Sequence, residues 1–251
     1  MSPPEATVAS FTITRYSPLA ALAGAFHMAS HRLQLRAVPG LRFFKLVGTG
    51  SGIGFSRTPD LRLWGLFAVW DTADAWERFR TSSRAMRHYR ARGDEVYSML
   101  LRPIAAHGLW SGVEPFGALP RPAARAQIAD EPIVVLTRAQ IRLRRQLRFW
   151  GAVPRVDETL RDHPDLLLTF GVGEVPYLRQ ATLSVWRSEA AMRSWAYGSE
   201  HHREVVRRTR AESWYAEELF ARFRLLRTYG SFGGKDPLAG ALPFVPDPSP
   251  R

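Results

Sequence analysis

The chain has 251 residues, of which 45% are hydrophobic and 23% are charged, as is ordinary for a globular protein with a buried core. It contains no cysteine, which excludes disulfides, thiolate catalysis, zinc–thiolate sites, iron–sulfur clusters and a cysteine-ligated haem. The formal net charge is +12, but the basic residues are dispersed, and all of them except Lys45 and Lys235 are arginines. We therefore predict no nucleic-acid binding, and leave open a looser attraction to anionic lipid.

The N-terminal segment MSPPEATVAS has neither a basic n-region nor an apolar h-region, so it does not predict a signal peptide. No stretch of the chain reaches the roughly 18–20 uninterrupted apolar residues that a membrane span needs. We therefore expect a cytoplasmic protein that is not integral to a membrane. Contact with the periphery of the inner membrane is left open.

In the first half of the chain, a β-branched run predicts a strand, and a long helical pattern follows over about 19–38. Two further strands come next, the first ending at glycines and the second ending in Val-Trp. Two helices separated by Ser82-Ser83 and a last strand complete the half. The segments are FTITRY (11–16), RFFKLVGTG (42–50), LRLWGLFAVW (61–70), TADAWERF (72–79) and LRPIAAHGLWSG (101–112).

The second half repeats this pattern. A β-branched first strand is followed by a helical pattern over about 143–161, a second strand that breaks at glycines, and a third that again ends in Val-Trp. Gly198-Ser199 then separates two helices, and a strand closes on an aromatic-glycine sequence. The segments are IVVLTRAQI (133–141), LLLTFGVGE (166–174), LRQATLSVW (178–186), SEAAMRSW (188–195) and FRLLRTYGSFGG (223–234).

Both halves have the order β-α-β-β-α-α-β, which is typical of a ferredoxin-like unit with helices on one face of an antiparallel sheet. One such sheet leaves an apolar face uncovered, and a second sheet can cover it. We therefore predict an α+β fold with two tandem ferredoxin-like units, 11–113 and 132–234, that form a two-sheet α/β barrel of the dimeric-barrel type within one chain. A proline-rich linker (114–131) joins them, and the proline-rich tail (235–251) is expected to be extended or disordered.

The glycine run Gly48–Gly54 has the spacing G-x-G-x-G-x-G, which matches neither the Rossmann fingerprint nor the Walker A loop. A strand or turn with close backbone approach explains it. The alternative is a loop beside a ligand pocket, with its N–H groups facing an anion such as a haem propionate.

Histidine is the natural haem ligand in a chain without cysteine, and tyrosine is a weaker candidate. His27 and His31 are four residues apart on the first helix, but no acidic residue accompanies them, so we expect packing rather than a metal site. The separate histidines His88, His107 and His163 carry no ligand pattern.

The pair His201-His202 is more informative because of its place on a helix. Gly198 ends one helix, and Ser199 is a suitable N-cap for the next. On this helix His202 shares a face with Val205, Val206 and Thr209. His201 shares a face with Val205 but also with Glu204 and Arg208. His202 is therefore the better candidate for an iron ligand, and the alternative is a satisfied core histidine.

Arginines on the same helix could meet haem propionates, although a solvated basic face explains them equally well. The cofactor-binding candidates are Arg203 and Arg210, and Arg207 and Arg208 lie beside them. Four tryptophans fit core positions, and any of them could also line an apolar substrate slot: Trp70, Trp186, Trp195 and Trp214.

The chain resembles the spheroidene monooxygenase family, the carotenoid 2-oxygenases of purple phototrophic bacteria. The resemblance covers most of 11–234. The matching segments are FFKLVGTGSGIGF (43–55), FAVW (67–70), VLTRAQI (135–141), RFWG (148–151), GVGEVPYLRQATLSVW (171–186) and GSEHHREVVRRTRAESWYAEELFARF (198–223).

The resemblance implies a monooxygenase with haem b and its iron, which uses O2 and an external, ferredoxin-like electron donor. It would insert oxygen at C2 of an acyclic carotenoid, first as hydroxyl and then as keto. The family's histidine falls at His202, with His201 as its neighbour. This sequence has Glu200-His201 where the family more often has Gly-Pro, which puts the choice between the two histidines in doubt.

Arg138, within VLTRAQI, is the predicted catalytic residue, as a distal or propionate partner. The alternatives are another haem enzyme of the same fold (aldoxime-dehydratase-like or peroxidase-like), a cofactor-independent monooxygenase, and a haem or lipid carrier without turnover. The sequence leaves a homodimer open.

Overall fold

The computed structural model describes residues 6–50, 58–119, 131–161, 163–175, 177–198 and 200–242. In the helices, only the backbone is described at 23, 27–29, 153–157, 159, 161 and 200–202. The predicted glycine run therefore contributes its first three residues to a strand, while 51–54 lie outside the described residues.

The first half follows the predicted element order. Its elements are β1 (Val8–Tyr16), the 3-10 turn η1 (Pro18–Ala20), α1 (Ala21–Arg36), β2 (Leu41–Gly50), β3 (Pro59–Trp70), α2 (Ala73–Ser82), α3 (Arg84–Arg92) and β4 (Gly93–Gly108). The second half repeats it. Its elements are β5 (Ile133–Ile141), the 3-10 turn η3 (Leu143–Arg145), α4 (Gln146–Arg161), β6 (Leu166–Val175), β7 (Arg179–Trp186), α5 (Glu189–Gly198), α6 (Glu200–Ala211) and β8 (Tyr215–Gly230).

The eight strands are hydrogen-bonded in the order β1-β3-β2-β6-β7-β5-β8-β4, which closes into a barrel. The predicted fold class is therefore confirmed. β1 pairs antiparallel with β3 and β4, and β5 pairs antiparallel with β7 and β8, as two copies of one motif should.

The chain divides into two compact units, whose bounds differ from the predicted ones. Unit 1 comprises 1–47, 61–102 and 225–251, and unit 2 comprises 48–60 and 103–224. The difference arises because β4 and β8 are each sixteen residues long. Each of these strands begins in one unit and ends in the other.

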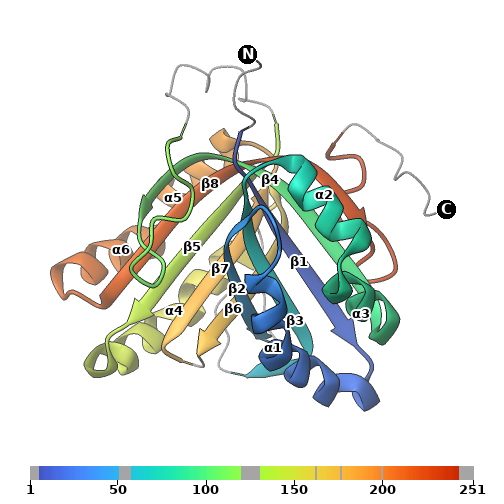
Figure 1. Cartoon of the computed structure of the whole chain (residues 1–251). Helices are drawn as coiled ribbons and strands as arrows, with labels where there is room; N and C mark the ends of the chain where they lie inside the picture. The colour runs from blue at the N-terminus through green and yellow to red at the C-terminus, as the bar shows by residue number, and fades with distance from the viewer. Residues whose placement is uncertain are drawn as a thin grey trace. The chain divides into compact units, whose positions relative to one another are not determined.

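Unit 1 packs α1 to α3 against one face of its strands (Figure 1). The Val-Trp strand end places Trp70 in this layer, where it is fully buried against Trp76 and Phe79 of α2. The predicted break at Ser82-Ser83 separates α2 from α3, and Ser83 caps α3 by accepting a hydrogen bond from the Met86 N–H. Thr72 caps α2 by accepting one from the Ala75 N–H.

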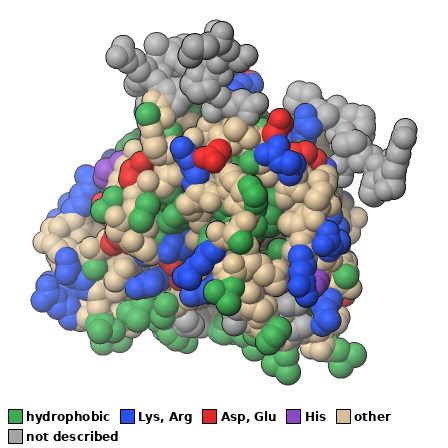
Figure 2. Space-filling model, in the orientation of Figure 1, with side chains coloured by type: hydrophobic (Ala, Val, Ile, Leu, Met, Phe, Trp, Pro, Cys, Tyr) green, Lys and Arg blue, Asp and Glu red, His purple; other side chains and the backbone are tan. Residues whose placement is uncertain are grey.

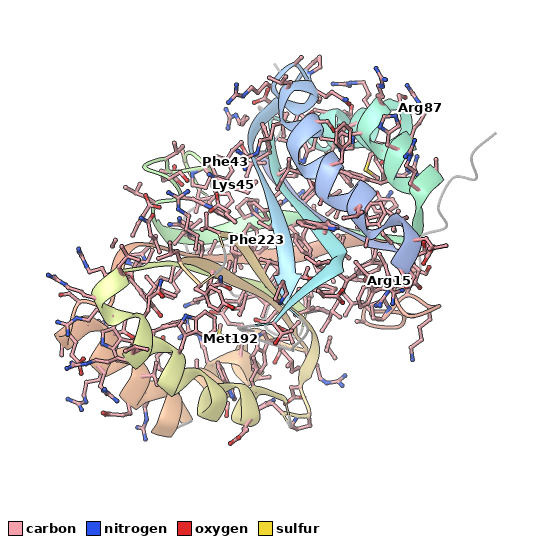
Figure 3. All side chains as sticks on the ribbon, turned by 90° about the horizontal axis from the view of Figure 1, so that it is seen from below. Arg15, Phe43, Lys45, Arg87, Met192 and Phe223 are labelled. Atoms are coloured by element: carbon pink, nitrogen blue, oxygen red, sulfur yellow. The ribbon has the colours of Figure 1, made fainter. Side chains whose placement is uncertain are left out.

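Unit 2 packs α4 to α6 against one face of β5–β8 (Figure 1). Trp186 takes the place of Trp70, and Ser188 caps α5 by accepting from the Ala191 N–H. Met192 of α5 and Phe223 of β8 are labelled in Figure 3 and mark the two faces of this sheet. Met192 belongs to the helix-covered layer, and Phe223 lies on the opposite face, where it contacts Phe116.

The segments predicted as linker and tail both contain buried residues. In the linker, Phe116 is fully buried. In the tail, the expectation of an extended or disordered chain is wrong for 235–242, because Asp236 accepts hydrogen bonds from Tyr97 and Thr228, and Leu238 is buried. The remainder of both segments, 120–130 and 243–251, lies outside the described residues.

Within the described residues, no helix is both long enough and apolar enough to cross a membrane. Lysine and arginine side chains are spread over the face shown in Figure 2 and are interrupted by apolar and acidic ones. This distribution agrees with the dispersal of arginine along the sequence.

Candidate functional site

The predicted iron ligands lie in α6 of unit 2. The backbone of His202 lies one turn before Val205, whose side chain packs in a cluster with Phe149 and Trp150 of α4. Thr209, one turn further on, is buried. The side chains of His201 and His202 lie outside the described residues, so the choice between them stays a prediction.

The sheet face beneath α4 and α6 carries small side chains. Its central cross-strand row runs from Gly171 on β6 to Thr182 on β7 and Thr137 on β5. The rows on either side contribute further small or polar residues at Thr169, Ser184, Gln180 and Ala139. This unit-2 floor, Gly171, Thr182, Thr137 and those neighbours, lies between two separate apolar clusters that pack at its ends.

In unit 1, large side chains fill the corresponding layer between the sheet and its helices. The repeat aligns Trp70 with Trp186, and therefore Leu66 with Thr182 and Trp64 with Gln180. Leu66 belongs to one continuous apolar cluster, and α1 approaches so closely that a Cβ on Gly24 would lie 2.5 Å from Trp64. The cavity that remains is about 10 Å³, which is too small for more than one water molecule.

The unit-2 floor fits a large flat group such as haem better than it fits a closed core. Threonine and glutamine replace the leucine and tryptophan of unit 1, and the Thr169 hydroxyl oxygen is buried with no hydrogen-bond partner among the described residues. A buried polar atom without a partner is uncommon in a finished core. The donor set also fits, because α6 supplies imidazole. Glu218 of β8, which lies opposite Ala139 on this face, is 4.0 Å from His107 Nε2.

The predicted propionate partners have a different placement. Arg203 and Arg210 are exposed and are two and five residues from Val205, which puts them on the far side of α6. Arg207 is exposed and pairs with Glu204, and Arg208 pairs with Glu212 and lies over the ring of Trp214. A role for Arg203 and Arg210 in cofactor binding stays a prediction.

Arg138 lies on the face of β5 opposite to the helices. Ile133 and Ile141 of the same strand pack under the helices, and the alternation of a strand then turns Arg138 to the other face. Its side chain is 1% exposed. Its role as a distal or propionate partner stays a prediction; a haem beside α6 would lie on the other face of β5.

Two carboxylates surround the buried guanidinium. Arg138 donates a short hydrogen bond to Glu217 of β8, and its Nη2 is 3.7 Å from Glu174 Oε1 of β6. Glu174 also accepts from the Trp110 indole N–H at 2.6 Å. The oxygens of Glu217 accept from the backbone N–H groups of Ser111 (2.8 Å) and Gly112 (2.6 Å). Sequence reasoning missed both glutamates.

Unit 1 contains a matching arrangement, and a glutamate together with the two backbone N–H groups from which it accepts is called a clamp below. Glu95 accepts from the N–H groups of Gly233 (3.1 Å) and Gly234 (2.6 Å) and pairs with Arg15, whose guanidinium lies over Phe232 (Figure 3 labels Arg15). In each unit a glutamate thus fixes the aromatic-glycine turn that follows a long strand. These turns were visible in the sequence as LWSG and SFGG, but nothing in the sequence identified the glutamates.

The two clamp glutamates predict a pH-dependent stability. Hydrogen bonds from Gly234 and Gly233 and the charge of Arg15 outweigh burial and hold the pKa of Glu95 below its usual range. Burial acts to raise the pKa of Glu217, but hydrogen bonds from Gly112 and Ser111 and the charge of Arg138 outweigh it, so this pKa is lowered too. Groups with a lowered folded-state pKa stabilise the fold above their unfolded-state pKa, and this contribution is lost as the pH falls through the folded-state value.

We therefore expect Glu95→Gln and Glu217→Gln to be less stable than the parent chain at pH 7, and their stability to fall less steeply between about pH 5 and pH 3. Urea unfolding at a series of pH values measures this. Glu204→Gln is the control, because Glu204 pairs with Arg207 on the exposed surface, where ion pairs contribute little. If the free energy of unfolding of both clamp variants falls between about pH 5 and pH 3 as steeply as that of the parent chain, the prediction is contradicted.

The other histidines whose side chains are described lie away from the unit-2 floor or pack at its edge, and the side chain of His27 lies outside the described residues. His31 is fully buried in unit 1, with its ring nitrogens 3.1 Å from Tyr89 Oη and 3.3 Å from His88 Nδ1. His163 packs against Trp186, and His107 stacks on Phe220. No group of three or more histidine or acidic side chains suited to a metal occurs in the described part of the chain.

No protein-family model matches the chain. Among solved structures, a crystal structure of aldoxime dehydratase superposes with a TM-score of 0.56 at 12% identity, covering 87% of this chain and 81% of that chain. This likeness shows the fold alone.

Curated relatives give the family. Spheroidene monooxygenase of Rhodobacter capsulatus is 38% identical over 236 residues, which cover 94% of this chain and 97% of the relative. Spheroidene monooxygenase of Cereibacter sphaeroides is 35% identical and covers 89% of this chain and 68% of its own length, and that of Rubrivivax gelatinosus is 34% identical and covers 78% and 73%. With this identity over most of both chains, the protein belongs to the spheroidene monooxygenase family, and it is a monooxygenase.

Proposed function

We propose that this chain is a haem-dependent monooxygenase that oxygenates C2 of an acyclic carotenoid such as spheroidene, first to the hydroxyl and then to the keto level. The names of the curated relatives support the substrate. The observation that carries the haem proposal is the unit-2 floor, where Thr182 and Gln180 stand in place of Leu66 and Trp64 of unit 1.

In this proposal the haem lies between the unit-2 floor and α4 and α6, and His202 of α6 is its ligand. Bound haem would supply the activation of O2, with electrons from an external, ferredoxin-like donor. The chain itself keeps the layer dry and orients what binds there. Phe149, Trp150 and Trp214 close one end of the floor, and Trp186 and Met192 close the other.

The test of this function is spectroscopic and chemical. Haem added to the purified chain should give a Soret band that shifts on reduction and on CO binding, and cells that accumulate acyclic carotenoids should form a 2-oxo product when they express the chain. No Soret shift would overturn the haem proposal, and product without haem would favour a cofactor-independent enzyme. Haem binding without product would favour another haem enzyme or a carrier.

Filling the floor should block haem binding without unfolding the chain. The double substitution Gln180→Trp with Thr182→Leu gives unit 2 the side chains of unit 1. Overpacking by this amount typically costs about 1–3 kcal/mol, so haem affinity should fall by about 5- to 150-fold. Haem titration followed at the Soret band measures the loss.

The control for this experiment is Thr182→Val, which has nearly the same size and should bind haem as the parent chain does. Circular dichroism of both variants checks that they fold. If the filled variant folds and binds haem with parental affinity, the cofactor does not lie over this floor.

A further inference from the structure

The start of α4 exposes large apolar side chains between arginines. Leu143 of η3 is 77% exposed and Leu147 of α4 is 92% exposed. Arg144 lies between them and is exposed as well, and Arg145 follows it. Figure 2 shows apolar side chains gathered over this turn. Leu143, Arg144, Arg145 and Leu147 are called the α4 patch below.

The arginines of the α4 patch lie at the N-terminus of α4, where a positive charge is unfavourable. A helix N-terminus carries partial positive charge, so arginines there are unfavourable, and α4 has no acidic residue in its first turn. Neither Arg144 nor Arg145 has an ion-pair partner among the described residues. Glu212, which lies close by, is already engaged with Arg148 and Arg208. An anionic partner outside the chain would remove this imbalance.

A pocket beside the α4 patch has the same chemistry. Its volume is about 560 Å³, it opens to the surface, and its walls combine apolar side chains with arginines. The lining residues include Leu143, Leu178 and Val175 together with Arg142, Arg144 and Arg179. No carboxylate is among the lining residues in the described part of the chain.

We propose that the α4 patch docks on an anionic phospholipid bilayer, with Leu143 and Leu147 inserted at the acyl boundary and the arginines against lipid phosphates. Exposed leucines flanked by arginines match this interface, where apolar burial and attraction to anionic headgroups act together. The mixed pocket matches a phospholipid headgroup and glycerol backbone in the same way. A second copy of the chain fits less well, because the like-charged patches would repel each other.

The equivalent turn of unit 1 shows what the arginines add. Leu22 occupies the position of Leu147 and is 82% exposed, and Leu19 of η1 is exposed beside it. Neither the 3-10 turn nor the first turn of α1 carries a basic or acidic residue. Of these two equivalent turns, only the one in unit 2 therefore has arginines beside its exposed leucines.

Because the chain has no cysteine, a single introduced thiol can report on the α4 patch. Leu147→Cys, labelled with the environment-sensitive fluorophore NBD, should brighten and shift to the blue on vesicles that contain phosphatidylglycerol. The control is Leu61→Cys, since Leu61 is an exposed leucine of β3. A shift at neither position, or an equal shift at both, would overturn the proposal, because a chain of charge +12 could adhere to such vesicles without a preferred face.

Vesicle sedimentation then measures affinity. Leu143→Gln with Leu147→Gln should lower partition to phosphatidylglycerol vesicles by about tenfold or more. Arg144→Gln should lower it at low salt and less at high salt, where charges are screened, and should do so more than Arg78→Gln, an exposed arginine of α2. If the leucine variant instead converts a dimer to a monomer in sedimentation velocity and binds vesicles like the parent, the surface is an interface between copies.

Discussion

Replacing His202 with alanine is expected to lower haem affinity by more than the roughly 10–100-fold that loss of an outer-shell partner costs a metal site. The reason is its place in α6, one turn before Val205, which packs against Phe149 and Trp150 of α4. Alanine is the best helix former, so α6 should persist in the variant. Haem titration at the Soret band measures the change, and addition of free imidazole should restore part of the spectrum.

The control is His201→Ala, which should keep most of the affinity of the parent chain. His201 is four residues from Val205 and His202 is three, so both are near the edge of the buried side of α6. If His201→Ala loses haem and His202→Ala keeps it, the ligand is His201. If both variants keep the Soret band, neither histidine holds the iron, and tyrosine, the weaker candidate, is the next residue type to test.

The repeat could be predicted from the sequence because its signals are local. The Val-Trp strand ends and the serine or threonine caps that follow recur at matching places, and each depends on neighbouring residues only. The barrel of two sheets could be predicted because one ferredoxin-like sheet leaves an apolar face uncovered, but the order of its strands was not predicted. The ordered part of the tail could not be predicted, because Asp236 is held by Tyr97, 139 residues earlier.

The environment of Arg138 was beyond sequence reasoning for a related reason. Both faces of β5 are largely buried, and polar residues of VLTRAQI fall on both of them, so the segment has no clean alternation of apolar and polar residues. It therefore does not reveal which residues face the helices. Because successive residues of a strand point to opposite faces, Arg138 and Thr137 lie on different faces of β5. Which of the two faces the helices is known only once the helices have packed. Its partner Glu217 is 79 residues away in the chain and was invisible to local pattern.

The buried guanidinium leads to the second large effect. Arg138→Met should destabilise the chain by about 3–5 kcal/mol, because it leaves the carboxylates of Glu174 and Glu217 buried without their cation. Urea unfolding at pH 7 measures the loss. The matched control is Arg224→Met, since Arg224 pairs with Glu131 at the surface, where an ion pair contributes about 0–1 kcal/mol.

Two further measurements separate the structural role of Arg138 from a role at the cofactor. Adding Glu174→Gln and Glu217→Gln to Arg138→Met should recover part of the lost stability, because the uncompensated charges are then gone. Folded Arg138→Met should also bind haem with parental affinity, because Arg138 faces away from α4 and α6. A loss of stability below 1 kcal/mol would mean that water reaches the carboxylates. A folded variant that no longer binds haem would place the cofactor on the opposite face of β5 and contradict the unit-2 floor as its site.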